Sequence, residues 1–349
     1  MGSHAKEREP GNWVVVYFDK PFALSVGAKR RSRRGWRFDF ACYASYAQRE
    51  RMLRFQTCTA TENCERRLGS NEPIAYPAPM SASLASIHIY PLKSCAPVAL
   101  DEAVVQTRGL AGDRRWMIVD ADDRFVTGRQ QPRLTLIRAK TDGDALHLAA
   151  PGMPDLRVDA PRAGRRVASE VWGAPVNPLL AADDAHAWIS TYLGAACRLV
   201  HMDEACVRPM QAKYDGKYGR PGDEVSFADG FPLLLISQAA LDALNDRLAA
   251  PVPMQRFRPN LVVAGTAPHA EDGWKRIRVG TIEFDVLKAC VRCVFTTVDF
   301  SRGAFAPDGE PLRTLIKYRR GPDGVTFGQN LIPRGRGTIA RGDAVEVLA

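Results

Sequence analysis

The chain has 349 residues, of which 46% are hydrophobic and 25% charged, a composition typical of a globular protein with room for two or three domains. The longest apolar stretch near its start, residues 13–18, is stopped by Asp19, and no stretch approaches the roughly 20 apolar residues that a membrane-spanning helix needs. Length and composition therefore exclude a transmembrane helix, and we predict no membrane association.

The formal net charge is +9, but residues 1–80 carry a net +6 and residues 81–349 only +3. A body this close to neutral cannot drive strong counterion-release binding, so we predict no nucleic-acid partner. Eight cysteines occur in a chain without a charged and then apolar signal segment. This pattern predicts free thiols in a reducing compartment and hence a cytoplasmic location.

Residues 1–80 show no sustained hydrophobic periodicity, and they hold a basic run at 29–34 and a Pro-rich segment at 73–79. Eight acidic residues argue against a mitochondrial presequence, which is poor in acids. We predict that residues 1–82 form a poorly ordered basic leader. Because Met80 stands just before the first patterned strand, a start codon assigned too far upstream is the alternative explanation.

From residue 84 the pattern changes to short extended runs separated by turn residues such as Gly109 and Gly112. The predicted strands lie at residues 87–90, 104–106, 116–119, 134–138 and 145–149. Asp183 can cap a helix that Gly194 ends. These elements predict a β-rich domain with a helical insert over residues 83–205.

Residues 206–349 are predicted to form a second domain, which contains a charged, Gly- and Pro-containing loop at 213–222. A helix is predicted from about Ser237, with leucines at helical spacing. Further strands are predicted at residues 260–263, 276–280, 281–286, 293–298 and 344–348. Many short strands and few helices predict a mainly β chain of the α+β class with closed or sandwiched sheets.

The best clue to chemistry is Cys290-x-x-Cys293, with Arg292 between the thiols, leading into a β-branched run. A structural zinc site needs four ligands, and a thioredoxin-like pair begins a helix rather than a strand. If the strand includes Cys290, the two thiols face opposite sides, so one alone faces a site. We choose Cys293 as the ligand of a soft metal; two buried core cysteines are the alternative.

Three basic clusters accompany the thiols. Arg256, Arg258 and Asn260 occupy alternate positions and share one face if their segment is extended, as a phosphate-binding edge would require. Lys93 with Ser94 ends the first strand, and Arg114 stands at a glycine turn. Each cluster taken alone could equally be a solvated surface loop or edge strand.

Taken in order, several segments resemble the family of molybdenum-cofactor sulfurase C-terminal (MOSC) domains with its N-terminal β-barrel partner. Within it, they look most like the mitochondrial amidoxime-reducing component and bacterial reductases of N-hydroxylated compounds. The resemblance covers about residues 84–349 and is carried by residues 89–95 (IYPLKSC), 112–114 (GDR), 129–134 (RQQPRL), 257–260 (FRPN), 292–299 (RCVFTTVD), 327–330 (FGQN) and 337–339 (GTI). It implies two β-barrel domains.

The resemblance also implies roles for single residues. Cys293 would be the protein ligand to molybdenum and the catalytic cysteine, in a molybdenum cofactor of the monophosphate form. Lys93, Ser94, Arg114, Arg258 and Asn260 would hold the pterin and its phosphate, with Arg292, Asn330 and the backbone at Asp229 and Gly230 nearby. For the wider family the resemblance extends to pyridoxal phosphate binding.

No cysteine follows Cys293, so this chain offers no plant-type iron–sulfur cluster after it, and electrons must come from a separate iron–sulfur or flavin protein. The leader also lacks the membrane anchor of the mitochondrial relatives. The predicted function is the reduction of small N-hydroxylated compounds, such as amidoximes or hydroxylamino bases. The alternatives are a sulfur carrier with a Cys293 persulfide and a non-enzymatic module that binds phosphate or another anion.

Overall fold

The computed structural model of the protein describes residues 26–30, 36–40, 81–210 and 217–349. The chain forms two compact units, Met1–Tyr76 and Pro77–Ala349. In the first, β1 (Val26–Arg30) pairs antiparallel with β2 (Trp36–Phe40). The rest of the predicted leader up to residue 80, and part of the loop predicted at residues 213–222, lie outside the described residues. Disorder of the leader stays a prediction.

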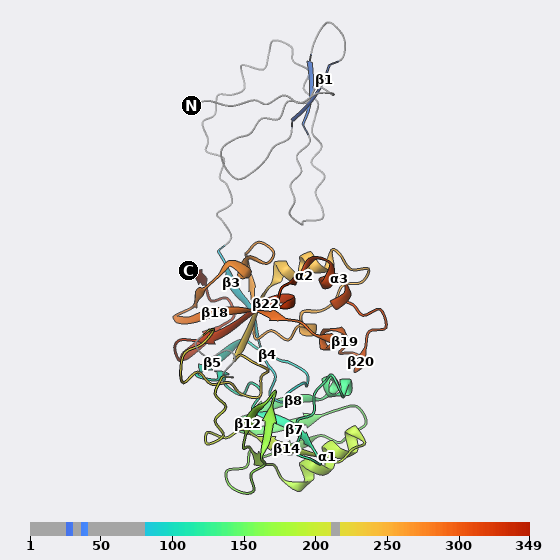
Figure 1. The fold of residues 1–349 in the computed structure, drawn as a ribbon, viewed down its shortest axis with the longest axis vertical. Coiled ribbons are helices and arrows are strands. Elements are labelled where there is room, and N and C mark those ends of the chain that lie inside the picture. The colour runs from blue at the N-terminus through green and yellow to red at the C-terminus, as the bar shows by residue number, and fades with distance from the viewer. Residues whose placement is uncertain (1–25, 31–35, 41–80, 211–216) are drawn as a thin grey trace. The chain divides into compact units, whose positions relative to one another are not determined.

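The second unit is built around one large sheet with the strand order β24-β17-β18-β22-β15-β16-β3-β4 and the short β21 beside β22 (Figure 1). β15 and β16 pair in parallel, whereas β3 is antiparallel to β16 and β18 to β22. The strands are β3 (Ser83–Ile89), β4 (Val98–Leu100), β15 (Leu233–Ser237), β16 (Leu261–Ala264), β17 (Arg276–Val279), β18 (Ile282–Val291), β21 (Arg320–Gly321), β22 (Gly324–Pro333) and β24 (Val345–Val347).

This sheet closes on itself because β3 also meets the segment that leads into β24. The N–H of Leu84 donates to the carbonyl of Asp343 (2.9 Å), and the N–H of Val345 donates to the carbonyl of Ala82 (2.8 Å). Residues from opposite ends of the second unit thus complete a barrel. Closure satisfies backbone groups that would otherwise form a sheet edge.

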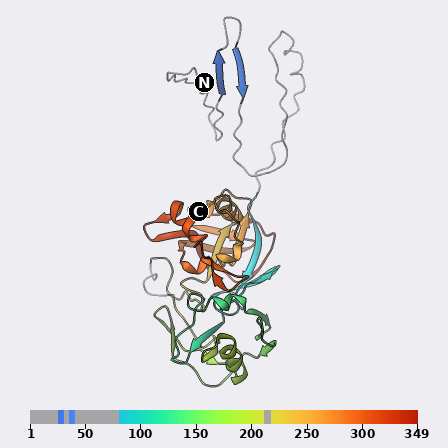
Figure 2. The same ribbon diagram turned by 90° about the vertical axis from the view of Figure 1, so that its right-hand side faces the viewer.

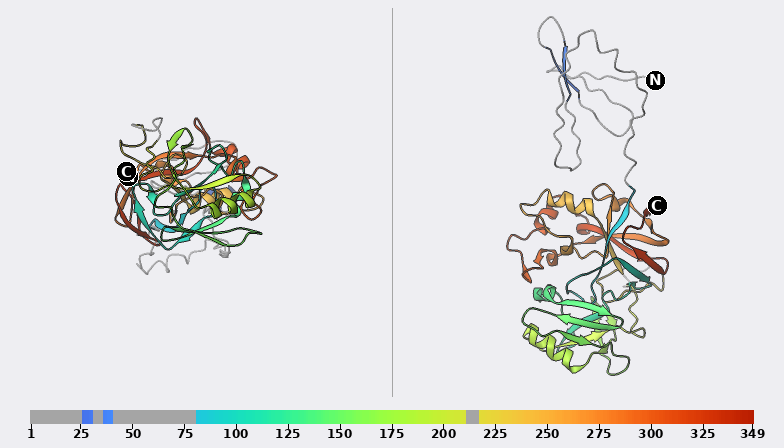
Figure 3. Two further views of the ribbon diagram at one scale, coloured as in Figure 1. Left: turned by 90° about the horizontal axis from the view of Figure 1, so that it is seen from below. Right: turned by 180° about the vertical axis from the view of Figure 1, so that it is seen from behind.

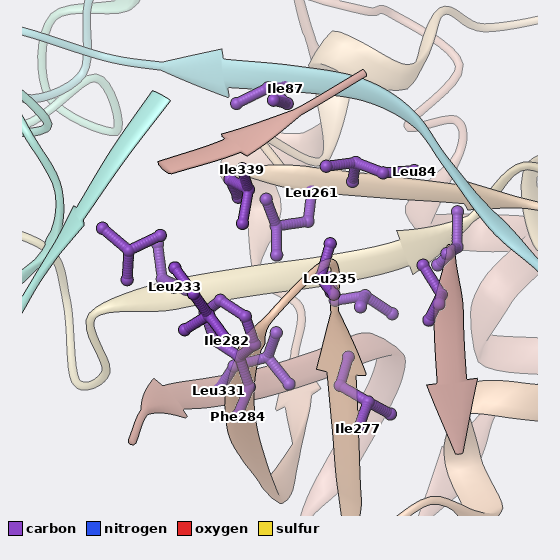
Figure 4. Packing of buried hydrophobic residues seen from close by; sticks show 14 of the residues in the cluster. Leu84, Ile87, Leu233, Leu235, Leu261, Ile277, Ile282, Phe284, Leu331 and Ile339 are labelled. Carbon is purple, nitrogen blue, oxygen red and sulfur yellow. The ribbon is translucent and has the colours of Figure 1, made fainter. Parts of the chain in front are cut away.

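The barrel is filled by large apolar side chains that point inward from neighbouring strands (Figure 4). Leu235, Leu261, Ile277, Phe284 and Leu331 are all fully buried in it. Alternate residues of a strand share one face, so the apolar positions of each strand meet in one core. Burial of each such side chain contributes about 1.5–3 kcal/mol.

A smaller sheet, ordered β23-β5-β6, packs on the same core. It consists of β5 (Glu102–Gln106), β6 (Gly109–Leu110) and β23 (Gly337–Ala340). Strands β3 to β6 lie in the segment predicted as the first domain, yet they share a core with strands after residue 230. The boundary at residues 205/206 stays a prediction, and the pairing shows that part of the first segment shares a core with the second.

Most of the remaining strands form a second lobe, the green part of the second unit in Figures 2 and 3. α1 (Asp183–Leu193) packs there on β14 and buries Trp188 and Ile189, and Gly194, with φ +68°, ends it as predicted. The strands of this lobe are β7 (Trp116–Asp120), β8 (Arg138–Asp142), β9 (Ala145–Ala149), β10 (Leu156–Val158), β11 (Ser169–Val171), β12 (Ala174–Val176), β13 (Leu179–Leu180) and β14 (Cys197–His201).

The mainly β, α+β prediction is confirmed. α2 (Gln238–Asn245) begins where expected, because the Ser237 hydroxyl accepts a hydrogen bond from the Ala240 N–H (3.2 Å). The other elements are α3 (Leu312–Tyr318), β19 (Val298–Asp299) and β20 (Ala304–Phe305). Among the described residues, no helix combines the length and apolar character needed to cross a membrane.

Two predicted strands are wrong. Most of residues 134–138 belongs to a 3₁₀ helix, Pro132–Leu136. The proline ring fixes φ of its first residue near a helical value, which favours the start of a helix there. Most of residues 293–298 belongs to another, Val294–Thr297. There the hydroxyls of Thr296 and Thr297 donate to the carbonyls three residues earlier, at 3.0 and 2.8 Å. These local hydrogen bonds compete with strand formation despite the β-branched composition.

Candidate active site

All ten residues proposed for the cofactor site from the sequence line one cavity of about 160 Å³ in the second unit. They come from six segments that are distant in the chain. The set is Lys93 and Ser94 after β3, Arg114 before β7, Asp229 and Gly230 before β15, Arg258 and Asn260 before β16, Arg292 and Cys293 after β18, and Asn330 in β22. The fold therefore brings the predicted set together, while the roles of its members toward a ligand stay predictions.

The cavity wall carries a large excess of positive charge. Among the described residues that line it, Asp229 is the one carboxylate, against six cationic side chains. An anionic ligand is favoured in such a cavity, because the partly buried cations gain more from it than from water. The cations are Lys93, Arg114, Arg129, Arg256, Arg258 and Arg292.

Lys93 is held inside the wall by two short hydrogen bonds. Its ammonium donates to the carboxylate of Asp229 (2.6 Å) and to the carbonyl of Phe227 (2.7 Å). Burial lowers the pKa of Lys93 to about 8, although the Asp229 carboxylate opposes that shift. Burial also raises the pKa of Asp229, but the Lys93 ammonium outweighs it and holds that pKa well below its usual range. The Asp229 side chain is 66% exposed, so water screens the pair.

Arg114 is oriented by two buried neighbours. Its guanidinium donates to the carboxylate of Asp113 (2.5 Å) and to the side-chain oxygen of Asn260 (3.0 Å). Burial lowers the pKa of Arg114, but the Asp113 carboxylate helps to raise it by a larger amount, so the net shift is upward. Asn260 is fully buried and also bonds to the backbone of Leu234 and His88. Asn260 therefore acts on the cavity by fixing Arg114.

Arg258 has a left-handed backbone, with φ +58°, and donates to the carbonyl of Cys95 (2.6 Å). Its guanidinium lies 4.0 Å from the ring centroid of Tyr90, and that of Arg114 lies 4.4 Å from the same ring. Burial lowers the pKa of Arg258 to about 10, so it stays charged at neutral pH. The Tyr90 ring thus holds both cations by cation–π contacts in a place where they also repel each other.

Two guanidinium nitrogens in the wall are buried and lack a hydrogen-bond partner: Nη2 of Arg292 and Nη1 of Arg256. The other donors of Arg292 are satisfied by the carbonyls of Phe327 (2.8 Å) and Phe257 (3.0 Å). Buried charged donors are normally paired, so unsatisfied ones at a cavity favour a ligand with anionic oxygens. The donor set therefore fits the phosphate that the resemblance implies.

The expected shared face of Arg256, Arg258 and Asn260 is wrong. Their segment is not extended, because Met254–Arg256 is a 3₁₀ helix and Arg258 is left-handed. All three nevertheless line the cavity, and the Arg256 guanidinium lies 3.9 Å from the carboxylate of Asp299. The folded loop, rather than strand alternation, brings them together.

Cys290 and Cys293 are both half-buried, and both line the cavity. β18 ends at Val291, so strand alternation does not reach Cys293, and the argument that the two thiols face opposite sides does not apply. The choice of Cys293 as the one ligand stays a prediction. Burial raises the pKa of Cys290, and its side chain also packs against an apolar cluster. Among the described residues, no group of three or more His, Cys, Asp and Glu side chains could hold a metal ion. A metal at Cys293 would need ligands from a cofactor.

The three remaining predicted residues, Ser94, Gly230 and Asn330, also line the cavity. Ser94 is buried with a left-handed φ of +70° at the turn after Lys93. Gly230 follows Asp229 in the loop that leads to β15. Asn330 is half-buried in β22, and its side-chain amide donates to the carbonyl of Lys288 on β18 (3.0 Å).

Arg129 and Trp172 also line the cavity but were not among the predicted site residues, and neither was Arg208, which does not line it. The guanidinium of Arg129 stacks 4.2 Å from the Trp172 ring, and the indole N–H of Trp172 donates to Asp229 (3.0 Å). Arg129 lies in one of the matched segments, so that signal was available. Trp172 stands in a hairpin turn, and Arg208 lies outside every matched segment. The sequence does not point to Trp172 or Arg208, because their place near the cavity depends on contacts between distant segments.

Comparison with protein families identifies both halves of the second unit. Residues 81–196 match the MOSC N-terminal beta barrel domain, and residues 222–346 match the MOSC domain. A mouse protein named mitochondrial amidoxime-reducing component 1 is 34% identical over 281 residues, which span 76% of this chain and 82% of the mouse protein. The chain belongs to the MOSC family.

A second relative with a similar name also matches this chain in sequence. A rat protein named mitochondrial amidoxime reducing component 2 is 35% identical over 245 residues, covering 68% of this chain and 72% of the rat protein. The crystal structure of the YUAD protein of Bacillus subtilis aligns with 77% of this chain and 96% of that protein, at 12% identity and a TM-score of 0.37. That structural likeness is too low to carry an argument.

Proposed function

We propose that this MOSC protein is a molybdenum-cofactor-dependent oxidoreductase that reduces small N-hydroxylated compounds, such as amidoximes or hydroxylamino bases, with electrons from a separate protein. The proposal is supported by the relatives named amidoxime-reducing components. The observation that carries it is the cavity in which the half-buried Cys293 lies among cations, two of which have unsatisfied buried donors.

The residues of the wall divide into two groups in this proposal. Arg258, Arg292 and Lys93 would contact the phosphate and pterin of the cofactor, because each holds charge at the cavity. Asn260 would act indirectly by orienting Arg114. Cys293 would supply the protein thiolate, the ligand class that suits molybdenum. When bound, the cofactor supplies two-electron reduction chemistry.

The overall conversion takes up two electrons and two protons for each N–O bond broken and releases water. The chain's own contribution is to bind the anionic cofactor, to keep its thiolate ligand in place and to exclude bulk water from the cavity. We propose that a partner protein supplies the electrons. A cytoplasmic location stays a prediction, because the relatives are mitochondrial by name. Pyridoxal phosphate binding gains no support from these relatives.

Metal analysis of the purified protein tests the proposal. We expect nearly one molybdenum per chain after expression in a host that makes the cofactor, and its loss in Cys293→Ser together with loss of benzamidoxime reduction. Cys206→Ser is the matched control, because Cys206 is a buried thiol in another cluster. Molybdenum absent from the wild type would refute the proposal. Transfer of labelled sulfur from a cysteine desulfurase to Cys293 would then support the sulfur carrier.

A further inference from the structure

Arg208 is a fully buried arginine, 1% exposed, whose guanidinium bonds to backbone carbonyls and, among the described residues, to no carboxylate. Nη1 donates to the carbonyls of Ser226 (2.8 Å) and Ala228 (2.5 Å). Nη2 donates to the carbonyls of Asp229 (2.8 Å) and Val171 (3.2 Å). Burial lowers its pKa to about 10, although Asp229 opposes the shift, so Arg208 is a cation at neutral pH.

These four carbonyls belong to two segments that meet only through the fold. Val171 ends β11 and precedes Trp172, whereas Ser226, Ala228 and Asp229 belong to the loop before β15. Both segments help to hold the Lys93 ammonium. The Trp172 indole donates to Asp229 (3.0 Å), and Asp229 and the Phe227 carbonyl accept from Lys93 (2.6 and 2.7 Å).

A buried cation without a carboxylate partner is costly, and an apolar side chain of similar volume would often stabilise a core as well. Arg208 differs from an apolar filler in having a planar fork that can bond to carbonyls in several directions at once. The two segments it joins form the part of the cavity wall that holds Lys93. Stability alone therefore does not account for a guanidinium here.

We propose that Arg208 is a positioning residue of the cavity: its guanidinium clamps the turn before Trp172 to the loop of Phe227 and Asp229, and so holds the Lys93 ammonium in place. The clamp lies behind the wall and needs no contact with a ligand. The inference deepens the proposed function, because it names a residue on which the cationic wall depends. Its test is chosen so that the two can fail separately.

Arg208→Lys separates geometry from charge. The variant keeps the positive charge, but an ammonium carries only three N–H donors on one atom, so it cannot keep all four hydrogen bonds to the two segments. The first measurement is the rate at which Lys93 reacts with acetic anhydride in the full-length protein, read by peptide mass spectrometry against the exposed Lys140. We expect a rise of at least about tenfold, the effect of losing a charge-assisted hydrogen bond from a local opening equilibrium.

Arg166→Lys is the matched control. Arg166 lies in the same lobe, bonds to Asp203 (2.6 and 3.0 Å) and to the carbonyl of Asn177 (2.7 Å), and does not line the cavity. We expect this control to leave the labelling of Lys93 unchanged. A second variant, Trp172→Phe, removes the indole donor to Asp229 at a half-buried position and should raise the labelling about threefold, because it loses one hydrogen bond to the Asp229 carboxylate.

The outcomes are distinct. Labelling of Lys93 in Arg208→Lys within twofold of the wild-type rate would overturn the clamp, and so would an equal rise in Arg166→Lys. If Arg208→Lys does not fold, an unchanged labelling rate in Trp172→Phe overturns the clamp instead.

A second readout is the molybdenum retained after gel filtration, which we expect to fall about fivefold in Arg208→Lys, because a displaced Lys93 loses one charge-assisted contact. A wild type without molybdenum refutes the proposed function, whereas the labelling still decides the role of Arg208.

Discussion

The ion pair of Lys93 and Asp229 offers a direct test of how the cavity keeps its positive charge. Asp229→Asn retains the size of the side chain and one acceptor oxygen but removes the negative charge 2.6 Å from the Lys93 ammonium. Burial has already lowered the pKa of Lys93 to about 8, and the Asp229 carboxylate is the first of the groups that oppose this shift. Removal of that charge should therefore lower the pKa of Lys93 further.

The magnitude follows from the exposure of the pair. An adjacent opposite charge shifts a pKa by about 1–3 units, and the smaller value applies because the Asp229 side chain is 66% exposed. One unit corresponds to about 1.4 kcal/mol. With a pKa of about 8, Lys93 in the wild type is roughly 90% protonated at pH 7. In Asp229→Asn it should be about half protonated.

The assay is the pH dependence of Lys93 acetylation, followed by mass spectrometry. We expect the midpoint of the profile to move down by about one unit, and the affinity for inorganic phosphate at pH 7 to fall with the charge. Asp323→Asn is the control, because Asp323 is a similarly exposed carboxylate that pairs with Lys288 (2.5 Å) away from the cavity wall. A midpoint that stays or moves upward would refute this account of the wall.

Two further predictions concern packing and a buried acid. Gly128→Ala should lower the molybdenum content and destabilise the fold by about 1–3 kcal/mol, because the added Cβ would come within 2.2 Å of the Phe295 ring. Phe295→Leu in the same chain should restore both the molybdenum content and the stability. The control Gly273→Ala should have little effect, because no heavy atom lies within 4 Å of its Cβ. Glu271→Gln should raise the free energy of unfolding at pH 7 by about 1 kcal/mol, since one carboxylate oxygen of this fully buried side chain has no partner. Burial raises the pKa of Glu271, so the wild type should lose stability as pH rises from about 4.3 through that raised pKa. Chemical denaturation curves should show this loss in the wild type and in the exposed control Glu170→Gln, but not in Glu271→Gln.

The sequence allowed a good prediction of the elements whose signals are local. α1 ends at the predicted Gly194, α2 begins after the predicted Ser237, and the strand at residues 145–149 has the predicted bounds. Caps, alternation and turn residues act over a few positions, so they can be read directly along the chain. The set of cavity residues was also predicted, but by resemblance to a family rather than by spacing.

The failed predictions near the cavity have local causes. Residues 293–298 have a strand-like composition, yet two threonine hydroxyls bond to the preceding turn and the segment becomes a 3₁₀ helix. Strand alternation was therefore not a valid guide to Cys293, and the same holds for the loop with Arg256 and Arg258. Propensity describes an average environment, and at the cavity local hydrogen bonds and left-handed residues replace it.

By itself, the sequence determined the fold class, the near-neutral body and the residue types available for an anion site. The tertiary structure alone decided that β3 completes the barrel beside β24, that both Cys290 and Cys293 reach one cavity, and that Arg208 joins two distant loops behind Lys93. These features consist of contacts between segments that lie tens to hundreds of residues apart. A local pattern in the sequence cannot predict such a contact, because each contact forms only when the shared core has packed.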